Sequence, residues 1–320
     1  MDIDFYITDS ESGQTFDVKT LVSNIEIFWQ LSEQAGRMTF DIIIKGMSFS
    51  EGSAVQLYHD SNKIFKGYVI AKQRKDDYIA SVTAYDTLFY LKSQQPFYFE
   101  QTTASERFSE VCGQFGIQNS VVHSASYNLS AKAYDNQTLS KIIQDGIDQT
   151  LAYTGKWYIL RDNFGTIEFL DLEQLKTDLV VGEASLMSGF DYKTDIEDAY
   201  NQVKLGKDNN QTNKRDVYIV KDSDTIRKWG LLQWYDTVGE SANPAQIEEK
   251  ATMLLKLKNR VNRTLSIDAI GDWRVRAGNS IFVVKRFDDM SLNRFMLVHS
   301  VKHKLRNKEH IMTLSLQVVE

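Results

Sequence analysis

Residues 278–316 contain three consecutive stretches that decide the fold. They read GNSIFVV at 278–284, RFMLVH at 294–299 and HIMTLSL at 310–316. The stretches are rich in β-branched and other apolar residues, which favour strands, and polar segments typical of turns separate them. Together they predict a three-stranded meander.

The same order of elements occurs near the other end of the chain. There the stretches read GSAVQLY at 52–58, FKGYVI at 65–70 and YIASVTA at 78–84. Both copies begin with a glycine, and both place a charged turn before the third stretch. We interpret the two copies as an internal repeat, and therefore as two related small antiparallel β-barrels. The alternative is that any two three-stranded meanders share this order.

Other runs of β-branched and aromatic residues surround the two copies. In the first ninety residues they predict strands at 3–7, 24–30, 37–44, 54–58, 63–74 and 78–85. From residue 189 onward they predict strands at 199–205, 216–221, 225–235, 263–270, 280–285, 294–305 and 310–318. Short strands joined by tight turns are typical of a small barrel.

The segment between the two β regions has helical patterns. Thr103 and Glu106 form a capping box, and apolar residues recur behind them at helical spacing as far as Gly116. A second helix is predicted over 139–155, and residues 156–170 predict a β-hairpin. We therefore expect an α/β module of two helices and one hairpin.

One helix is expected within the second β region. Asn243 is its predicted N-cap and Pro244 its first helical residue, and apolar residues follow at helical spacing. The fold class is thus mainly β with an α+β insertion. The expected domains are a first barrel at 1–95, the α/β module at 96–187 and a second barrel at 188–320, with its inserted helix near 244–259.

Composition excludes several classes of protein. The chain has 320 residues, 42% of them hydrophobic, and a net charge of −6 without a basic stripe, which argues against disorder and against nucleic-acid recognition. No apolar run approaches the roughly 18 residues of a membrane span. The N-terminus lacks the features of a secretory signal, so we expect synthesis and folding in the cytosol.

Signals of metal or cofactor chemistry are weak. His299 and His303 share one face of a predicted strand, but four residues of strand span about 13 Å, too far for two ligands of one ion. We therefore expect surface histidines on an exposed strand, with no metal site and no cofactor. Cys112 lies on the apolar face of a capped helix, where a core role is the simpler interpretation.

No catalytic motif stands out either. The chain has 43 Asp and Glu residues, but nothing singles out an acid pair, and Glu197-Asp198 fits a turn before a strand. Phosphate-binding loops and nucleophile elbows do not occur in the sequence. We therefore expect a protein that is not an enzyme and has no catalytic residues.

Two pairs of adjacent aromatic residues are candidate interface anchors: Phe28 with Trp29, and Trp234 with Tyr235. Neighbours on a strand point to opposite faces, so at most one ring of each pair enters a core. The other ring is either an ordinary surface aromatic or a contact for a partner.

Four segments resemble the hub proteins of contractile phage tails and tailocins, the PBSX XkdQ/YqbQ type. They are AYDTLFYL at 84–91, residues 139–160, DAYNQV at 198–203 and the terminal meander at 278–316. The resemblance covers most of the chain and depends on the order of the segments as much as on identity. It implies a structural protein of the tail baseplate, in a phage or in a bacteriocin-like particle.

The resemblance also implies the partners. It predicts a homotrimer whose duplicated barrels form a pseudo-six-fold ring, and this ring joins the hexameric tail tube to the trimeric central spike and contacts other baseplate proteins. The particle would be assembled in the cytoplasm of the bacterial host. The alternative function is a tail-associated protein that binds or hydrolyses cell-wall glycan.

Overall fold

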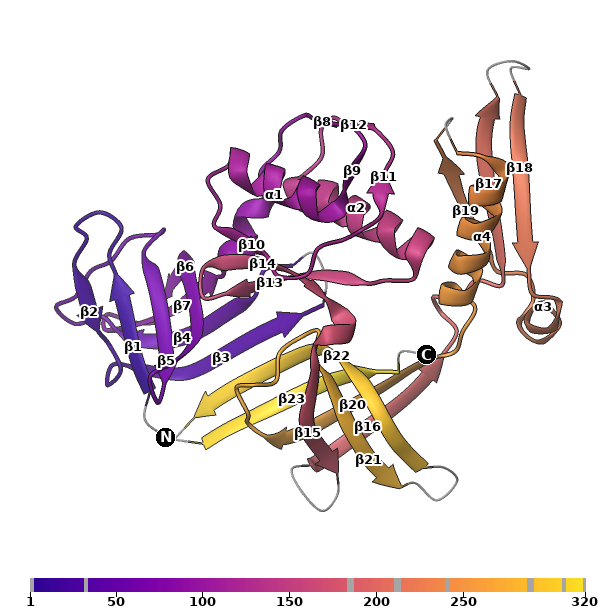
Figure 1. Cartoon of the computed structure of the whole chain (residues 1–320). Helices are drawn as coiled ribbons and strands as arrows, with labels where there is room; N and C mark the ends of the chain where they lie inside the picture. The colour runs from indigo at the N-terminus through magenta and orange to yellow at the C-terminus, as the bar shows by residue number, and fades with distance from the viewer. Residues whose placement is uncertain are drawn as a thin grey trace.

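The computed structural model describes residues 3–31, 34–182, 187–209, 214–239, 242–286, 291–306 and 309–318. The chain is mainly β, with two β units, an α/β module beside them and a smaller αβ insertion (Figure 1). Among the described residues, no helix combines the length and apolar character that crossing a membrane requires.

The first β unit is antiparallel throughout, in the strand order β3-β4-β7-β6-β5-β1-β2. Its strands are β1 (Ile3–Thr8), β2 (Thr15–Asp17), β3 (Val22–Gln30), β4 (Arg37–Ile43), β5 (Ala54–His59), β6 (Asn62–Arg74) and β7 (Ile79–Tyr85). The burial of these strands alternates residue by residue, because only one face of the sheet covers the core. The strands expected in this region are confirmed, and β2 is an additional short one.

The second β unit uses residues from both sides of the insertion. Its strands are β15 (Lys176–Gly182), β16 (Met187–Asp195), β20 (Asn262–Ile270), β21 (Ser280–Arg286), β22 (Ser291–Arg306) and β23 (Glu309–Gln317). The predicted terminal meander is confirmed as β21, β22 and β23. Strand β15 pairs with β21 in parallel, unlike the antiparallel pairing of β1 with β5.

The two units share one continuous sheet of 13 strands, because the long β22 pairs first with β21 and then with β3. The main hydrogen-bonded path through this sheet ends at β16 on one side and at β2 on the other. The two closed barrels expected from the sequence are therefore not confirmed within the part of the chain that the structure describes.

The middle module lies against the joint between the two units (Figure 1). Its elements are η1 (Thr87–Lys92), β8 (Phe97–Phe99), β9 (Thr102–Thr103), α1 (Ala104–Gln114), β10 (Asn119–Val121), β11 (Asn128–Leu129), β12 (Lys132–Tyr134), α2 (Leu139–Thr154), β13 (Tyr158–Asn163), β14 (Thr166–Asp171) and η2 (Leu172–Gln174). The capping box of Thr103 and Glu106, the two helices and the β13–β14 hairpin are confirmed. The short strands β8 to β12 were not expected.

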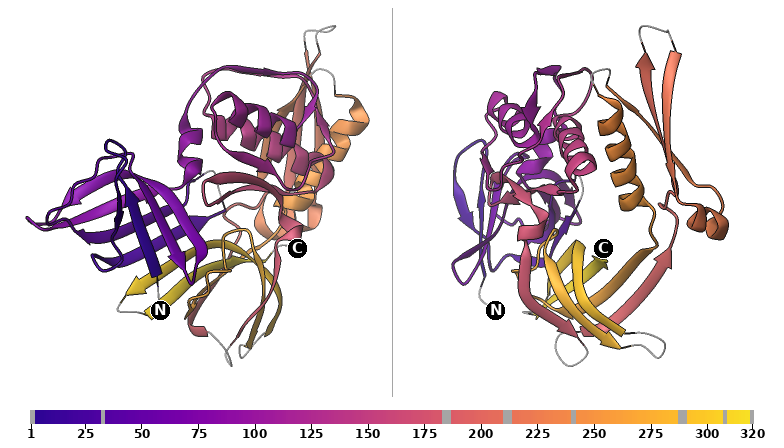
Figure 2. Two further views of the ribbon diagram at one scale, coloured as in Figure 1. Left: turned by 60° about the vertical axis from the view of Figure 1, so that its left-hand side comes forward. Right: turned by 45° about the vertical axis from the view of Figure 1, so that its right-hand side comes forward.

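The insertion within the second β region is larger than the single helix expected. It contains β17 (Gln202–Asn209), β18 (Lys214–Lys221), α3 (Ser223–Trp229), β19 (Gln233–Val238) and α4 (Pro244–Lys258). Helix α4 begins at the expected cap, Asn243, and packs on β17 and β18 (Figure 2). The three strands form their own sheet, separate from the large one.

The strand predicted over residues 225–235 is wrong in its first half. Asp222 caps a helix there, because its side chain accepts hydrogen bonds from the backbone amides of Asp224 and Thr225. Gly230, with φ of +80°, ends this helix, and only then does β19 begin. The division of the chain at residues 95 and 187 stays a prediction.

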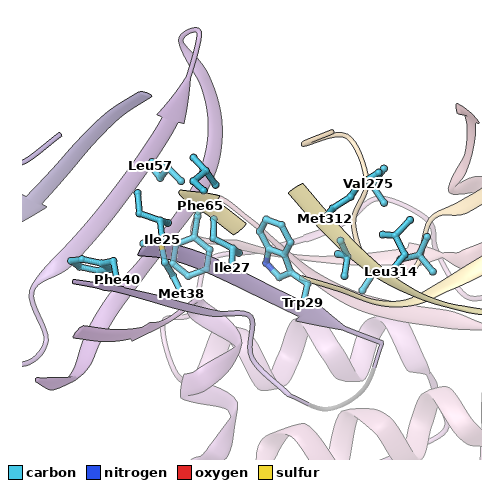
Figure 3. Close-up of a cluster of buried hydrophobic side chains, with 14 of the residues drawn as sticks. Ile25, Ile27, Trp29, Met38, Phe40, Leu57, Phe65, Val275, Met312 and Leu314 are labelled. Atoms are coloured by element: carbon cyan, nitrogen blue, oxygen red, sulfur yellow. The ribbon is translucent and has the colours of Figure 1, made fainter. Parts of the chain in front are cut away.

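The main hydrophobic core runs through both β units without interruption. Figure 3 shows Trp29 between side chains of the first unit and side chains of the second. The first unit contributes, among others, Ile27, Leu57 and Phe65, and the second contributes Val275, Met312 and Leu314. The two units therefore fold against each other around a shared core.

Candidate functional site

The first β unit has a distinctive set of hydrogen bonds where its repeat begins. Gly52 has a φ of +85°, and its amide donates to the carbonyl of Val69 at 2.7 Å. The amide of Val69 donates back to the carbonyl of Ser53 at 2.9 Å. Directly after Val69 the pairing of β6 with β7 shifts by one residue, before Ala71. Such a shift is a β-bulge, which bends and twists the strand.

The second β unit repeats each of these features. Gly278 has a φ of +90°, and its amide donates to the carbonyl of Val298 at 2.9 Å. The amide of Val298 donates back to the carbonyl of Asn279 at 2.8 Å. The pairing of β22 with β23 then shifts before Ser300. The repeat predicted from the sequence is thus confirmed in its hydrogen bonds, and it has the alignment that the sequence indicated.

A side-chain pair also recurs. Ser81 bonds to the carboxylate of Asp41 in the first unit, and Thr313 Oγ1 lies 2.7 Å from Asp268 Oδ1 in the second. Asp41 stands opposite Ser81 in the strand pairing, and Asp268 stands opposite Thr313. Backbone and side chains therefore give the same correspondence between the units.

The joint between the units is the antiparallel pairing of β22 with β3, in which Val301 lies opposite Trp29. Both of these side chains are buried, and Trp29 is only 5% exposed. On the other face of the joint, Lys304 Nζ lies 3.8 Å from Glu26 Oε1. The joint thus combines a buried apolar face with an exposed ion pair.

Two histidines lie in the buried face near this joint. His303 is fully buried and His310 nearly so, and their ring nitrogens Nδ1 and Nε2 lie 2.9 Å apart. Burial lowers the pKa of His303 to about 3 and that of His310 to about 4. The expectation of a surface histidine on an exposed strand is wrong for His303, because Trp273 stacks on its ring and on that of His310.

A buried polar cluster connects the joint to the middle module. Asp86 Oδ2 accepts a hydrogen bond from the Gly36 amide at 2.9 Å, and Asp162 Oδ1 accepts one from the Gly165 amide at 3.1 Å. Arg276 Nη2 donates to the carbonyl of Asp162 at 2.9 Å. Asp86 follows the first unit, Asp162 belongs to β13, and Arg276 precedes β21, so three parts of the chain meet here.

Burial shifts the pKa values of the charged side chains in this cluster. Burial, followed by the nearby Asp162, raises the pKa of Asp86 well above its usual value. Burial also raises the pKa of Asp162 and lowers that of Arg276 to about 10. The Arg276 guanidinium lies 4.2 Å from the centre of the Trp29 ring. We interpret the cluster as the connection between both units and the middle module.

The cavity at this cluster is small. It measures about 20 Å³, close to the volume of a single water-sized sphere, and Trp29, Asp86 and Arg276 are among its lining residues. A hollow of about 250 Å³ lies nearby, and Tyr158 is the only titratable side chain in its lining. Neither cavity brings together carboxylates around an accessible space. Within the described ranges, no group of three His, Cys, Asp or Glu residues could hold a metal ion.

The candidate interface anchors lie in two separate places. Trp29 is buried at the joint, so it is an anchor inside the chain and not on its surface. Phe28 is half-buried on the opposite face, 6.0 Å from the Arg37 guanidinium. Trp234 is half-buried on the inserted sheet beneath Lys258, whereas Tyr235 is 44% exposed. Contacts of Phe28, Trp234 and Tyr235 with a partner stay a prediction.

Two further expectations are confirmed. Glu197 and Asp198 lie in a turn. Cys112 is fully buried among the apolar side chains of the middle module, and burial raises the pKa of its thiol to about 12. The sequence reasoning missed Asp86, Asp162 and Arg276 as a group, because they are far apart in the chain and share no motif spacing.

The chain is thus one of a class of mainly β proteins built on an internal repeat. Its two related β units lie in one sheet, and an α/β module lies at their joint. Within that class the chain belongs to the YQBQ-like family, whose model matches residues 25–317.

Two relatives come from Bacillus subtilis (strain 168). The chain is 27% identical to the uncharacterized protein YqbQ over 270 residues, 83% of this chain and 81% of that protein. It is 26% identical to the phage-like element PBSX protein XkdQ over 270 residues, 83% of this chain and 82% of that protein. The fold is similar to that of the 43 kDa tail protein of prophage MuSo2 from Shewanella oneidensis, with a TM-score of 0.73, 13% identity and 98% of each chain covered.

Proposed function

We propose that this protein is the structural hub of a contractile phage-type tail baseplate. Three copies form a ring of six β units with approximate six-fold symmetry, and the ring joins a hexameric tail tube to a trimeric central spike. Other baseplate proteins attach around it. The hub is made in the cytoplasm of the bacterial host and resides in the tail of the virion or tailocin.

The observation that carries this proposal is the repeat within the large sheet. Two units with the same hydrogen bonds at Gly52 and Gly278 lie side by side in one chain. Three such chains present six similar units, which is what a junction between three-fold and six-fold partners requires. Membership of the YQBQ-like family, with a relative in the phage-like element PBSX, supports a place in a tail.

The proposed role is binding and not catalysis. The buried cluster of Asp86, Asp162 and Arg276 surrounds a cavity of about 20 Å³, which has no room for a substrate. Within the described ranges, no feature of the structure favours the alternative, a protein that binds or cuts cell-wall glycan. Hydrolysis of purified peptidoglycan, lost on substitution of one carboxylate, would replace our proposal with that alternative.

The molar mass in solution tests the proposal. Light scattering on the purified protein is expected to show a species near about 110 kDa, three times the chain mass of 36.8 kDa, alone or on addition of the spike protein. A monomer that remains unchanged when the tube and spike proteins of the same tail are added would overturn it.

A further inference from the structure

The correspondence between the two β units extends to their neighbouring strands. Ala84 of β7 lies opposite Met38 of β4, and the equivalent Leu316 of β23 lies opposite Leu265 of β20. Strand β4 then pairs with β3, and β20 pairs with β16 in the same antiparallel manner. Strand β3 of the first unit is therefore the equivalent of β16 in the second, and β6 is the equivalent of β22.

Under this correspondence, the joint between β22 and β3 has a counterpart between β6 and β16. That counterpart is not formed within the described part of the chain. After its bulge, β22 pairs with β3 along Ser300–Leu305. The equivalent part of β6, from Ala71 to Arg74, pairs only with β7, and no strand among the described residues lies on its other edge. Strand β16 likewise ends the path of the large sheet.

We propose that these two edges pair between neighbouring copies of this chain. The second half of β6 in one copy adds antiparallel to β16 of the next copy, in the register that β22 and β3 use within one chain. In that register Ala71 lies opposite Asp195 of the next copy, and Gln73 lies opposite Lys193. This inference rests on the proposed function, because it names the contact that closes the ring.

The charges of the two edges fit this pairing. Within the chain, Lys304 and Glu26 form the ion pair that crosses the joint. Their equivalents are Lys75, directly after β6, and Asp191 of β16, so the same signs of charge face each other across the proposed contact. Lys75 Nζ also lies 2.7 Å from Asp41 Oδ1 of its own unit, so the proposed contact places Lys75 between two carboxylates. Coulomb attraction between them favours this register over one shifted by two residues.

The charges of the β6 edge also disfavour its pairing with a second β6 edge. The β6 edge carries Arg74, together with Lys72 and Lys75, which pair with Glu51 and Asp41 of their own unit, so two β6 edges would bring like charges together. Charged side chains on an exposed strand edge also protect it from indiscriminate pairing before the correct partner arrives. The β16 edge is mixed, because Lys193 lies between Asp191 and Asp195 and pairs with Asp195. The contact joins two different edges, so it is head-to-tail, and a rotation near 60° per joint closes a ring after three copies.

Disulfide trapping tests the register. Two single variants, Gln73→Cys and Lys193→Cys, are purified separately, mixed and oxidised. Both residues are exposed, and the native Cys112 is buried and does not compete. Directly opposed residues of an antiparallel pair lie about 4.5–5.5 Å apart between Cα atoms, within the range that a disulfide spans. We expect a linked dimer from the mixture and none from either variant alone.

The matched control shifts the register by two residues. A mixture of the Gln73→Cys and Asp191→Cys variants places the cysteines diagonally, so its linked product should be several-fold weaker. Equal yields from both mixtures, or a Gln73→Cys homodimer as the main product, would overturn the inference. A charge exchange gives a second measurement: Lys75→Glu and Asp191→Lys should each weaken the trimer, and the double variant should restore it.

The outcomes separate this inference from the proposed function. A wild-type trimer in which residues 73 and 193 do not link refutes the inference alone. In a double variant that carries both Gln73→Cys and Lys193→Cys, linked ladders longer than three chains would confirm the contact but contradict the closed trimer. A chain that stays monomeric with its tail partners and gives no link refutes both.

Discussion

His303 Nδ1 and His310 Nε2 share a hydrogen bond of 2.9 Å inside the second β unit. His303 Nε2 lies 3.0 Å from the carbonyl of Val275, which can only accept, so this nitrogen holds the ring proton. In the neutral ring Nδ1 is then an acceptor, and His310 Nε2 donates to it. The hydrogen bond between the rings is lost once both imidazoles are protonated, because His303 Nδ1 and His310 Nε2 then both carry a proton.

This relationship predicts a loss of stability in mild acid. The folded pKa values, about 3 for His303 and about 4 for His310, lie below the usual value of 6.5, so the unfolded chain binds more protons as the pH falls. The contribution of the two histidines to the free energy of unfolding is fully present above about pH 6.5 and is lost progressively as the pH falls toward 4. We expect the free energy of unfolding to fall by about 2 kcal/mol between pH 7 and pH 5 from His303 alone.

Thermal unfolding at the two pH values checks this expectation. The double variant His303→Gln with His310→Gln should be less stable at pH 7 but should lose much of the pH dependence. A pH dependence in the double variant equal to that of the wild type would contradict the role of the histidine pair.

The buried polar cluster predicts unequal effects for its two kinds of charge. Arg276→Met should destabilise the protein by about 3–5 kcal/mol, because Asp86 and Asp162 lose their nearby cation. Asp86→Asn should cost less, because the substitution removes a carboxylate whose charge burial disfavours, as the raised pKa of Asp86 indicates. Urea unfolding followed by tryptophan fluorescence measures both changes. The control is Arg274→Ala, whose exposed side chain pairs with Asp272 and should contribute less than about 1 kcal/mol.

The equivalent glycines of the repeat predict graded effects of alanine. Gly52→Ala should cost about 1–2 kcal/mol, because its φ is +85° and the nearest atoms leave room for a methyl group. Gly278→Ala should cost more, because a Cβ there would lie 2.4 Å from Ile159 Cδ1. Gly113→Ala, in helix α1 with open space around it, should instead stabilise by about 0.5–1 kcal/mol. Denaturation midpoints compare the three, and equal effects at Gly52 and Gly278 would show that the contact with Ile159 relaxes at little cost.

The thiol of Cys112 should be inert in the folded protein. Burial raises its pKa to about 12, so almost no reactive thiolate forms at neutral pH. A thiol reagent such as DTNB is expected to react with one equivalent only after denaturant is added. Rapid reaction of the native protein would show that the middle module opens easily.

The elements that the sequence predicted well are those with local signals. The capping box of Thr103 and Glu106 and the C-terminal Gly155 delimit helices by contacts within a few residues. The error at residues 225–235 has a similar origin. Apolar residues there suggested a strand, but the cap at Asp222 and the left-handed Gly230 determine a helix.

The exposure of a side chain was harder to predict. His303 was expected at the surface, yet Val275 and Trp273 cover it from a loop about thirty residues earlier in the chain. Trp29 was a candidate contact for a partner, and it is buried because β22 pairs with β3 from the far end of the sequence. The cluster of Asp86, Asp162 and Arg276 depends in the same way on segments that meet only after folding.

The repeat, with its alignment of Gly52 with Gly278 and of Val69 with Val298, could be recognised from the amino-acid sequence. Alternating apolar residues and a left-handed glycine act through local geometry, so they can be recognised in the sequence without knowledge of the fold. That the two copies share one sheet could not be predicted in this way, because strand edges pair through backbone groups that are alike in every sequence. The tertiary structure likewise leaves β16 and the second half of β6 each with one edge unpaired among the described strands.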